Sequence, residues 1–405
     1  MLPKLDTKDK FVFVIGLFAM IKFRILGTFA LSELIVFASY FFIPQIYTIK
    51  YPRKVINFIL MASLWLMGVI ISDLFNNTNI ENSLKGSFNV VFIILAIPFV
   101  YWSLYDKPRR MLYYWLGAGL SEVLSFYFQR VEGYNEFDAD VWRVYAYYPL
   151  FVALSGYIYF KGKHLLACIT IECFAVWSLF HMSRNVFLSM TLGVTVVFFI
   201  DYILKRYKEN SQAVFRKKLV RLAVILGVAM LGVVTTYEYL AQNKILGESA
   251  YKKYMIQKNK DRGLASGRND FFESFDMAIK SPAFGYGSYA RWNNINYSNT
   301  ASRHMDYPFN KEDEMIPGHS YLMGAWTYSG ILGLIFWIYV LYEMIKFVNN
   351  ALIYDKKLIG INVLMSFMMF WNIMFSPFSD RLNLVYYMVL ILILQLQYYK
   401  FRHKI

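Results

Sequence analysis

The sequence predicts an all-α integral membrane protein with about twelve transmembrane helices and one long polar loop in its C-terminal half. Three observations lead to this prediction. Hydrophobic residues make up 58% of the 405 residues and charged residues only 17%, which is too little charge to cover a water-soluble protein of this size. Apolar runs of roughly 20 residues recur along the chain. Lys and Arg gather in the short segments between these runs, as they do in cytoplasmic membrane loops.

Each expected span is an apolar run bounded by charged or turn-forming residues. The first run is short and meets Lys22 and Arg24, so it is tilted, re-entrant or merged with the second. The fifth run is interrupted by Glu122, which leaves the count open by about one span. The runs lie at 11–23, 25–47, 56–74, 87–105, 111–128, 142–160, 164–181, 185–204, 219–237, 319–345, 358–378 and 382–399.

The distribution of cations sets the expected orientation. With the N-terminus in the cytoplasm, the inner segments hold about 24 Lys and Arg, whereas the opposite short loops hold about seven. Only Lys22 and Arg24 oppose this pattern. Both termini are therefore expected in the cytoplasm. We expect about nine helices in residues 1–237, a large external loop at 238–318 and about three helices in 319–405.

The long external loop contains one short amphipathic pattern. Residues 267–279 (GRNDFFESFDMAI) carry apolar side chains at helical spacing, which predicts a helix that lies on the membrane or covers a cavity. Ser281-Pro282 is expected to end this helix, and Gly285-Tyr286-Gly287 is expected to form a turn.

Several function classes are disfavoured by the same sequence. The formal charge of +15 comes from cations spread over short loops, so we expect no nucleic-acid partner. Cys168 and Cys173 lie in one apolar run and point to different faces of a helix, which indicates neither a disulfide nor a metal pair. No phosphate-binding glycine loop, metal-spaced His/Cys cluster or nucleophile elbow occurs, so no metal and no cofactor are expected.

Three polar residues stand out on the expected non-cytoplasmic side, where a cation at a span end is costly and indicates function. Arg184 lies in HMSRN, Arg268 begins the loop helix, and His319 lies in PGHSYL, where the loop returns to the membrane. Each also has a simpler interpretation: Arg184 can extend to the interface, Arg268 can be a solvated loop cation, and His319 can cap a helix.

Together, these three residues suit one reaction. Two guanidinium groups at the outer face fit a diphosphate, because Arg binds phosphate oxygens bidentately and stays charged. A neighbouring imidazole can accept the proton of an attacking hydroxyl. The combination predicts glycosyl transfer from a lipid diphosphate donor, in which stabilisation of the leaving diphosphate is the larger effect.

Four stretches resemble the O-antigen polymerase and O-antigen ligase superfamily of bacterial envelope proteins. They are SRNVFLSM around Arg184, GRNDFFESFDMAIKSPAFGYGS at 267–288, GHSYLMGAWTYSGILGLIFW at 318–337 and FSPFSDRLNLVYY at 375–387. Each motif is weak alone, but their order and spacing are moderately specific. The chain departs from the family at Ser320, where Asn is common, and at Tyr328, where many members have an acid.

The resemblance implies a metal-independent, glycosyltransferase C-like enzyme of the bacterial inner membrane, active at the periplasmic face in surface polysaccharide or lipopolysaccharide biosynthesis. It implies that Arg184 and Arg268 hold the diphosphate of an undecaprenyl-diphosphate-linked oligosaccharide and that His319 acts on the acceptor hydroxyl. Arg381 is a weaker candidate for a further phosphate or sugar contact. The expected partners also include membrane lipids and a protein that regulates chain length.

The resemblance leaves the acceptor open. A polymerase transfers the glycan to another lipid-linked repeat unit, and a ligase transfers it to lipid A-core. We favour the polymerase, because the loop is rich in aromatic residues that can stack on sugars and shows no additional acceptor domain. A lipid-linked glycan flippase is the alternative from another class, although the one large asymmetric loop and the lack of an internal repeat argue against it.

Overall fold

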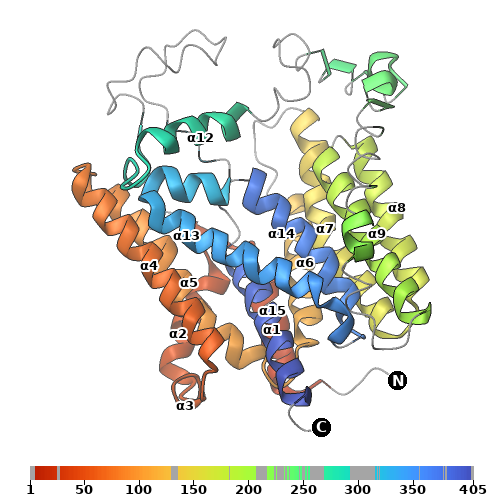
Figure 1. Cartoon of the computed structure of the whole chain (residues 1–405), viewed down its shortest axis with the longest axis horizontal. Coiled ribbons are helices and arrows are strands. Elements are labelled where there is room, and N and C mark those ends of the chain that lie inside the picture. Colours follow the sequence, from red (N-terminus) through yellow and green to blue (C-terminus); the bar gives the residue numbers. More distant parts are fainter. Residues whose placement is uncertain are drawn as a thin grey trace.

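The computed structural model describes residues 5–24, 28–128, 136–181, 183–206, 269–291, 320–354, 356–376 and 381–402, together with residues 315, 316, 318 and 378 and isolated stretches between 217 and 255. This part of the chain is almost entirely helical (Figure 1). The elements are α1 (Thr7–Leu17), β1 (Lys22–Arg24), β2 (Thr28–Ala30), α2 (Leu31–Phe42), α3 (Gln45–Thr48), α4 (Arg53–Phe75), α5 (Ile80–Leu104), α6 (Arg110–Phe128), α7 (Glu136–Phe160), α8 (His164–Phe180), α9 (Arg184–Arg206), α12 (Asn269–Lys280), α13 (Tyr321–Asn349), a 3₁₀ turn (Ala351–Ile353), α14 (Ile359–Phe375) and α15 (Arg381–Arg402).

The prediction of a helical membrane protein is confirmed. Four helices in the described part of the chain are long and apolar enough to cross a bilayer: Arg53–Phe75, Ile80–Leu104, Asn185–Ile203 and Tyr321–Asn349. Four shorter helices are also apolar: Leu31–Phe42, His164–Phe180, Ile359–Phe375 and Arg381–Gln397. The predicted span at 219–237 falls mostly outside the described residues, so the total of about twelve spans stays a prediction.

The first two predicted spans are half-length helices joined by a β-hairpin. The polar residues Lys22 and Arg24 end the apolar run, and β1 pairs antiparallel with β2 through Phe23 and Phe29. Helices of 11 and 12 residues are only about 17 Å long, much less than the roughly 30 Å of a bilayer core. In Figure 1, α2 and α3 lie at the end of the molecule that carries both termini. This arrangement favours the re-entrant interpretation.

Helix α15 lies in the centre of the helical bundle. It packs against α4, α5, α13 and α14, and its residues from Leu384 to Leu394 are all at most 6% exposed. A helix that is apolar on every side is expected to be buried in this way. The stacked rings of Tyr114 and Tyr386, with centroids 4.0 Å apart, join α15 to α6.

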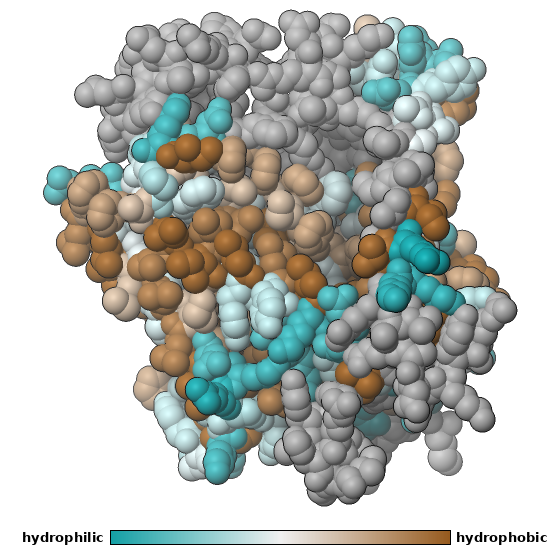
Figure 2. Space-filling view, in the orientation of Figure 1, coloured by the Kyte–Doolittle hydropathy of each residue, from teal (hydrophilic) through white to brown (hydrophobic). Residues whose placement is uncertain are grey.

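The lipid-facing surface is a band of apolar side chains across the middle of the molecule (Figure 2). Polar side chains of α12 border this band on one side, and further polar side chains border it toward the end that carries the termini. The band contains exposed residues of α4 and α13, including Leu60, Met67, Ile331, Ile335 and Ile338. An apolar surface between polar ends, as this face of the molecule shows, is expected of a protein that spans a bilayer.

Candidate functional site

The predicted site residues belong to elements that begin at one end of the molecule. Arg268 and His319 lie outside the described residues, and the side chain of Arg184, the first residue of α9, is also outside them. Their neighbours are described. Arg268 directly precedes α12, and His319 lies between Gly318 and the helix cap Ser320.

The end of α14 brings two of these elements together. Helices α9 and α14 run antiparallel, because Ser189 contacts Met368 and Gly193 contacts Leu364 one turn earlier in α14. The start of α9 therefore lies beside the end of α14. Ser320 donates a hydrogen bond from Oγ to the carbonyl oxygen of Ile373 (2.8 Å), which places the start of α13 beside the same end of α14.

The amphipathic loop helix is confirmed as α12, and its buried side packs on α13. Ser274, Met277 and Ala278 are buried, and Thr327 of α13 donates a hydrogen bond to the carbonyl oxygen of Ser274 (3.0 Å). The ring of Phe271 contacts that of Phe375 at the end of α14, with centroids 5.6 Å apart. Helix α12 therefore covers the start of α13 and the end of α14 (Figure 1).

Helix α13 is broken at Gly330, whose φ of 66° and ψ of −160° are outside helical values. The break frees backbone groups that the loop after α12 then satisfies. The N–H of Tyr286 donates to the carbonyl oxygen of Thr327 (2.8 Å), and the N–H of Ile331 donates to that of Ala283 (3.3 Å). Gly285 and Gly287 also have positive φ, as the predicted turn requires. The loop is thus part of the helix–helix packing.

The end of α4 holds this turn from the other side. Ser72 accepts a hydrogen bond from the N–H of Gly287 (2.9 Å) and donates one to the carbonyl oxygen of Tyr328 (2.8 Å). The Asp73 carboxylate accepts from the backbone N–H of Ser288 (2.5 Å) and from its hydroxyl (2.9 Å). Asp73 and Ser288 are each 4% exposed.

The two residues that depart from the family pattern shape the chain around His319. Ser320 caps α13 by accepting from the N–H of Met323 (3.1 Å). The Tyr328 hydroxyl donates to the carbonyl oxygen of Ile316, and its ring is so close to Gly318 that a Cβ there would meet it at 2.7 Å. The backbone is therefore held on both sides of His319.

Arg381 is described and is already paired with protein groups. Its Nη2 lies 2.8 Å from Oε2 of Glu33, its Nη1 donates to Asn89, and its guanidinium lies over the rings of Phe29 and Phe92. Arg381 is 8% exposed. These contacts join α15 to α2 and α5. The predicted phosphate or sugar contact of Arg381 stays a prediction.

Several residues of this region were not among the predicted site residues. Asp73 and Asn89 stand near the ends of apolar runs and resemble ordinary span-end polar residues, so only the tertiary contacts mark them. Glu33 gives no sequence signal of its role, because its partner Arg381 is 348 positions away.

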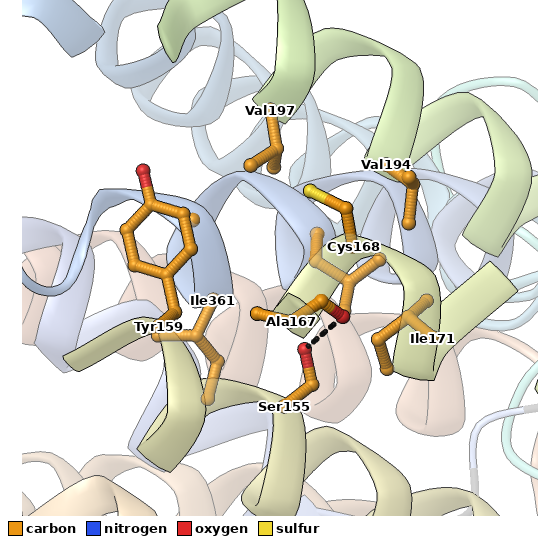
Figure 3. A pocket seen from close by; sticks show the side chains of 10 residues that line it. Ser155, Tyr159, Ala167, Cys168, Ile171, Val194, Val197 and Ile361 are labelled. Atoms are coloured by element: carbon orange, nitrogen blue, oxygen red, sulfur yellow. Dashed lines mark hydrogen bonds between the residues drawn. The ribbon is translucent and has the colours of Figure 1, made fainter. Parts of the chain in front are cut away.

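The pocket drawn in Figure 3 lies elsewhere, between α7, α8, α9 and α14. Its volume of about 20 Å³ is enough for a water molecule but not for a sugar. Mostly apolar side chains line it, and the hydroxyl of Ser155 donates to the carbonyl oxygen of Ala167 (3.0 Å). Cys168 borders the pocket and, like Cys173, is a free thiol, as predicted. We interpret the pocket as a packing void.

One protein-family model matches part of the chain. Residues 169–338 match the family model described as O-antigen ligase. No curated protein and no solved structure matches the chain. The matched range runs from α8 to the middle of α13, so it contains Arg184, Arg268, His319 and the break at Gly330. Arg381 lies beyond it. Among the described residues, no three or more His, Cys, Asp or Glu side chains gather as metal ligands would.

Proposed function

We propose that this multi-pass membrane protein, which carries an O-antigen ligase family domain at residues 169–338, is a surface polysaccharide polymerase. The family consists of membrane enzymes of the O-antigen polymerase and ligase type, which transfer lipid-linked glycans. The proposed reaction joins an undecaprenyl-diphosphate-linked glycan to another lipid-linked repeat unit at the periplasmic face of the inner membrane.

One observation supports transfer from a lipid diphosphate donor above the others. The family match contains all three residues that the chemistry requires, and α9, α12 and α13, which begin at or directly after them, meet around the end of α14. A site assembled from several helix starts places positive backbone ends toward one region, which favours an anionic ligand such as a diphosphate.

In the proposed reaction, the acceptor hydroxyl attacks the anomeric carbon of the donor sugar. A new glycosidic C–O bond forms while the bond between the sugar and the diphosphate breaks, and undecaprenyl diphosphate leaves. His319 accepts the proton of the hydroxyl. Arg184 and Arg268 bind the diphosphate and stabilise the negative charge that develops on it, which is the larger contribution to the rate.

An in-vitro assay with purified protein in lipid distinguishes polymerase activity from ligase activity. Undecaprenyl-diphosphate-linked repeat units are supplied alone and then together with lipid A-core. We expect a ladder of longer lipid-linked glycans from the donor alone. Product formed only when lipid A-core is present would instead identify a ligase. No product under either condition would favour a lipid-linked glycan flippase.

Residue roles are tested with the same substrate. Arg184→Ala and Arg268→Ala should weaken donor binding, whereas His319→Ala should lower turnover with little change in donor binding. Unchanged donor affinity in both arginine variants would remove the diphosphate role. Wild-type turnover in correctly inserted His319→Ala would remove the base role. Activity should persist in EDTA, and its loss with recovery on adding a divalent ion would overturn metal-independent transfer.

A further inference from the structure

The turn at 285–289 lies between the end of α4 and the start of α5. Gly86 of α5 allows this approach, because a Cβ at that position would meet the hydroxyl oxygen of Ser288 at 1.9 Å. On the other side, Asp73 binds both hydrogen-bond donors of Ser288. A buried carboxylate is costly unless it is hydrogen-bonded, so Asp73 and Ser288 stabilise one defined position of the turn.

Tyr289, the residue after Ser288, is held by a contact with α5. Asn89 of α5 donates a hydrogen bond to the hydroxyl of Tyr289 (3.1 Å), and its side-chain oxygen accepts from Arg381. Tyr289 has a φ of 54°, a conformation that residues with a Cβ rarely adopt. Surrounding contacts must therefore maintain it, and backbone conformations of this kind gather at functional sites.

The turn at 285–289 is followed by residues 290 and 291, which contact the segment that leads into His319. The N–H of Ile316 donates to the carbonyl oxygen of Ala290 (2.9 Å), and Arg291 forms an antiparallel bridge with Met315. Tyr328 fixes the carbonyl oxygen of Ile316, and Ser320 is fixed by Ile373. The chain that leads into His319 therefore depends on where residues 288–291 lie, whereas the chain after His319 is held by α14.

We propose that Asp73 is a positioning residue for glycan transfer. By holding Ser288, it fixes residues 288–291 and, through Met315 and Ile316, the approach of the chain to His319. Asp73 acts through these residues and does not itself touch the reacting groups. The inference rests on the proposed function, because His319 has an acceptor hydroxyl to act on only in a transfer enzyme.

The test measures donor-alone lengthening of lipid-linked glycan by Asp73→Asn, Ser288→Ala and the double variant. We expect kcat to fall about 10- to 100-fold in each single variant, because a misplacement of about 1 Å has effects of this size, while the donor KM changes less than about 3-fold. The double variant should be no worse than the poorer single variant, since both changes remove one shared contact.

Asp201→Asn is the matched control. Asp201 of α9 is also buried, and it accepts a hydrogen bond from Tyr159 (2.8 Å) and pairs with His164 (3.1 Å) toward the opposite end of α9. We expect Asp201→Asn to lower thermal stability but to leave kcat per folded enzyme unchanged.

The outcomes separate the positioning role of Asp73 from the proposed transfer function. Asp73→Asn with kcat equal to that of Asp201→Asn, at equal folded fractions, would overturn the positioning role. Fully additive losses in the double variant would do the same. Absence of transfer by the wild type with every acceptor would overturn the proposed function and this inference together, whereas an active wild type and an unimpaired Asp73→Asn overturn the inference alone.

Discussion

Arg381 lies between Glu33 and Asn89, with its guanidinium 2.8 Å from the Glu33 carboxylate. We expect Arg381→Ala to destabilise the protein by about 3–5 kcal/mol, because it removes the guanidinium that pairs with the buried Glu33 carboxylate. Thermal unfolding in lipid or detergent measures the loss. Glu33→Gln combined with Arg381→Ala should recover part of it. A stable Arg381→Ala that no longer binds donor would instead favour the predicted phosphate contact.

A cluster of charges at the start of α1 should make stability depend on acid. The hydrogen bond from Lys107, followed by that from the backbone N–H of Asp9 and that from Arg110, holds the pKa of Asp6 well below its usual value. Burial alone would raise the pKa of Asp106, but hydrogen bonding to Arg110 lowers it overall.

Because both pKa values are lower in the folded state, their contribution is complete above the unfolded value of about 3.9 and is lost as the pH falls through the folded values. We expect the melting temperature to fall below about pH 4. Asp6→Asn should be less stable than wild type at pH 6, and the difference should shrink toward pH 3. A difference that does not depend on pH would show that these charges do not govern acid stability.

At the scale of elements, the break in α13 should tolerate no side chain at Gly330. A Cβ there would meet the carbonyl oxygen of Ala283 at 2.1 Å, in addition to the strain of a positive φ. We expect Gly330→Ala to lower both the melting temperature and transfer activity. Gly162→Ala is the matched control, since Gly162 has a φ of 80° but no atom within 4 Å of the added Cβ. Equal effects of the two substitutions would rule out the backbone contact as the cause.

Long helices were predictable and interrupted ones were not. The expected span at 56–74 became α4 (Arg53–Phe75), and that at 164–181 became α8, because charged or turn-forming residues bound each apolar run. The break at Gly330 arises from hydrogen bonds exchanged with residues 283–286, about 45 positions away, and these bonds leave no periodic signal. Arg184, Arg268 and His319 could be predicted because they lie in short sequence motifs. Asp73 could not, because its role depends on a contact with Ser288, which is distant in sequence.

At the scale of the whole molecule, the distribution of cations predicts that the α12 end faces the periplasm. In a variant without Cys168 and Cys173, Lys280→Cys should react with a membrane-impermeant thiol reagent in cells whose outer membrane is permeable to it. Lys50→Cys should react only after the inner membrane is opened. Lys280 is the last residue of α12, and Lys50 lies between α3 and α4; both side chains are exposed. The reverse labelling pattern would place the proposed site in the cytoplasm.

The pair of Glu33 and Arg381 also has a consequence for biogenesis. Helix α2 precedes α15 in the chain, so it is synthesised and enters the membrane earlier, and it then carries an acid whose partner follows 348 positions later. Until α15 arrives, Glu33 must remain solvated, protonated or bound by another group. Completion of the contacts of Glu33 is therefore a late step of assembly, because a nascent chain that stops before Arg381 lacks the guanidinium that pairs with this acid.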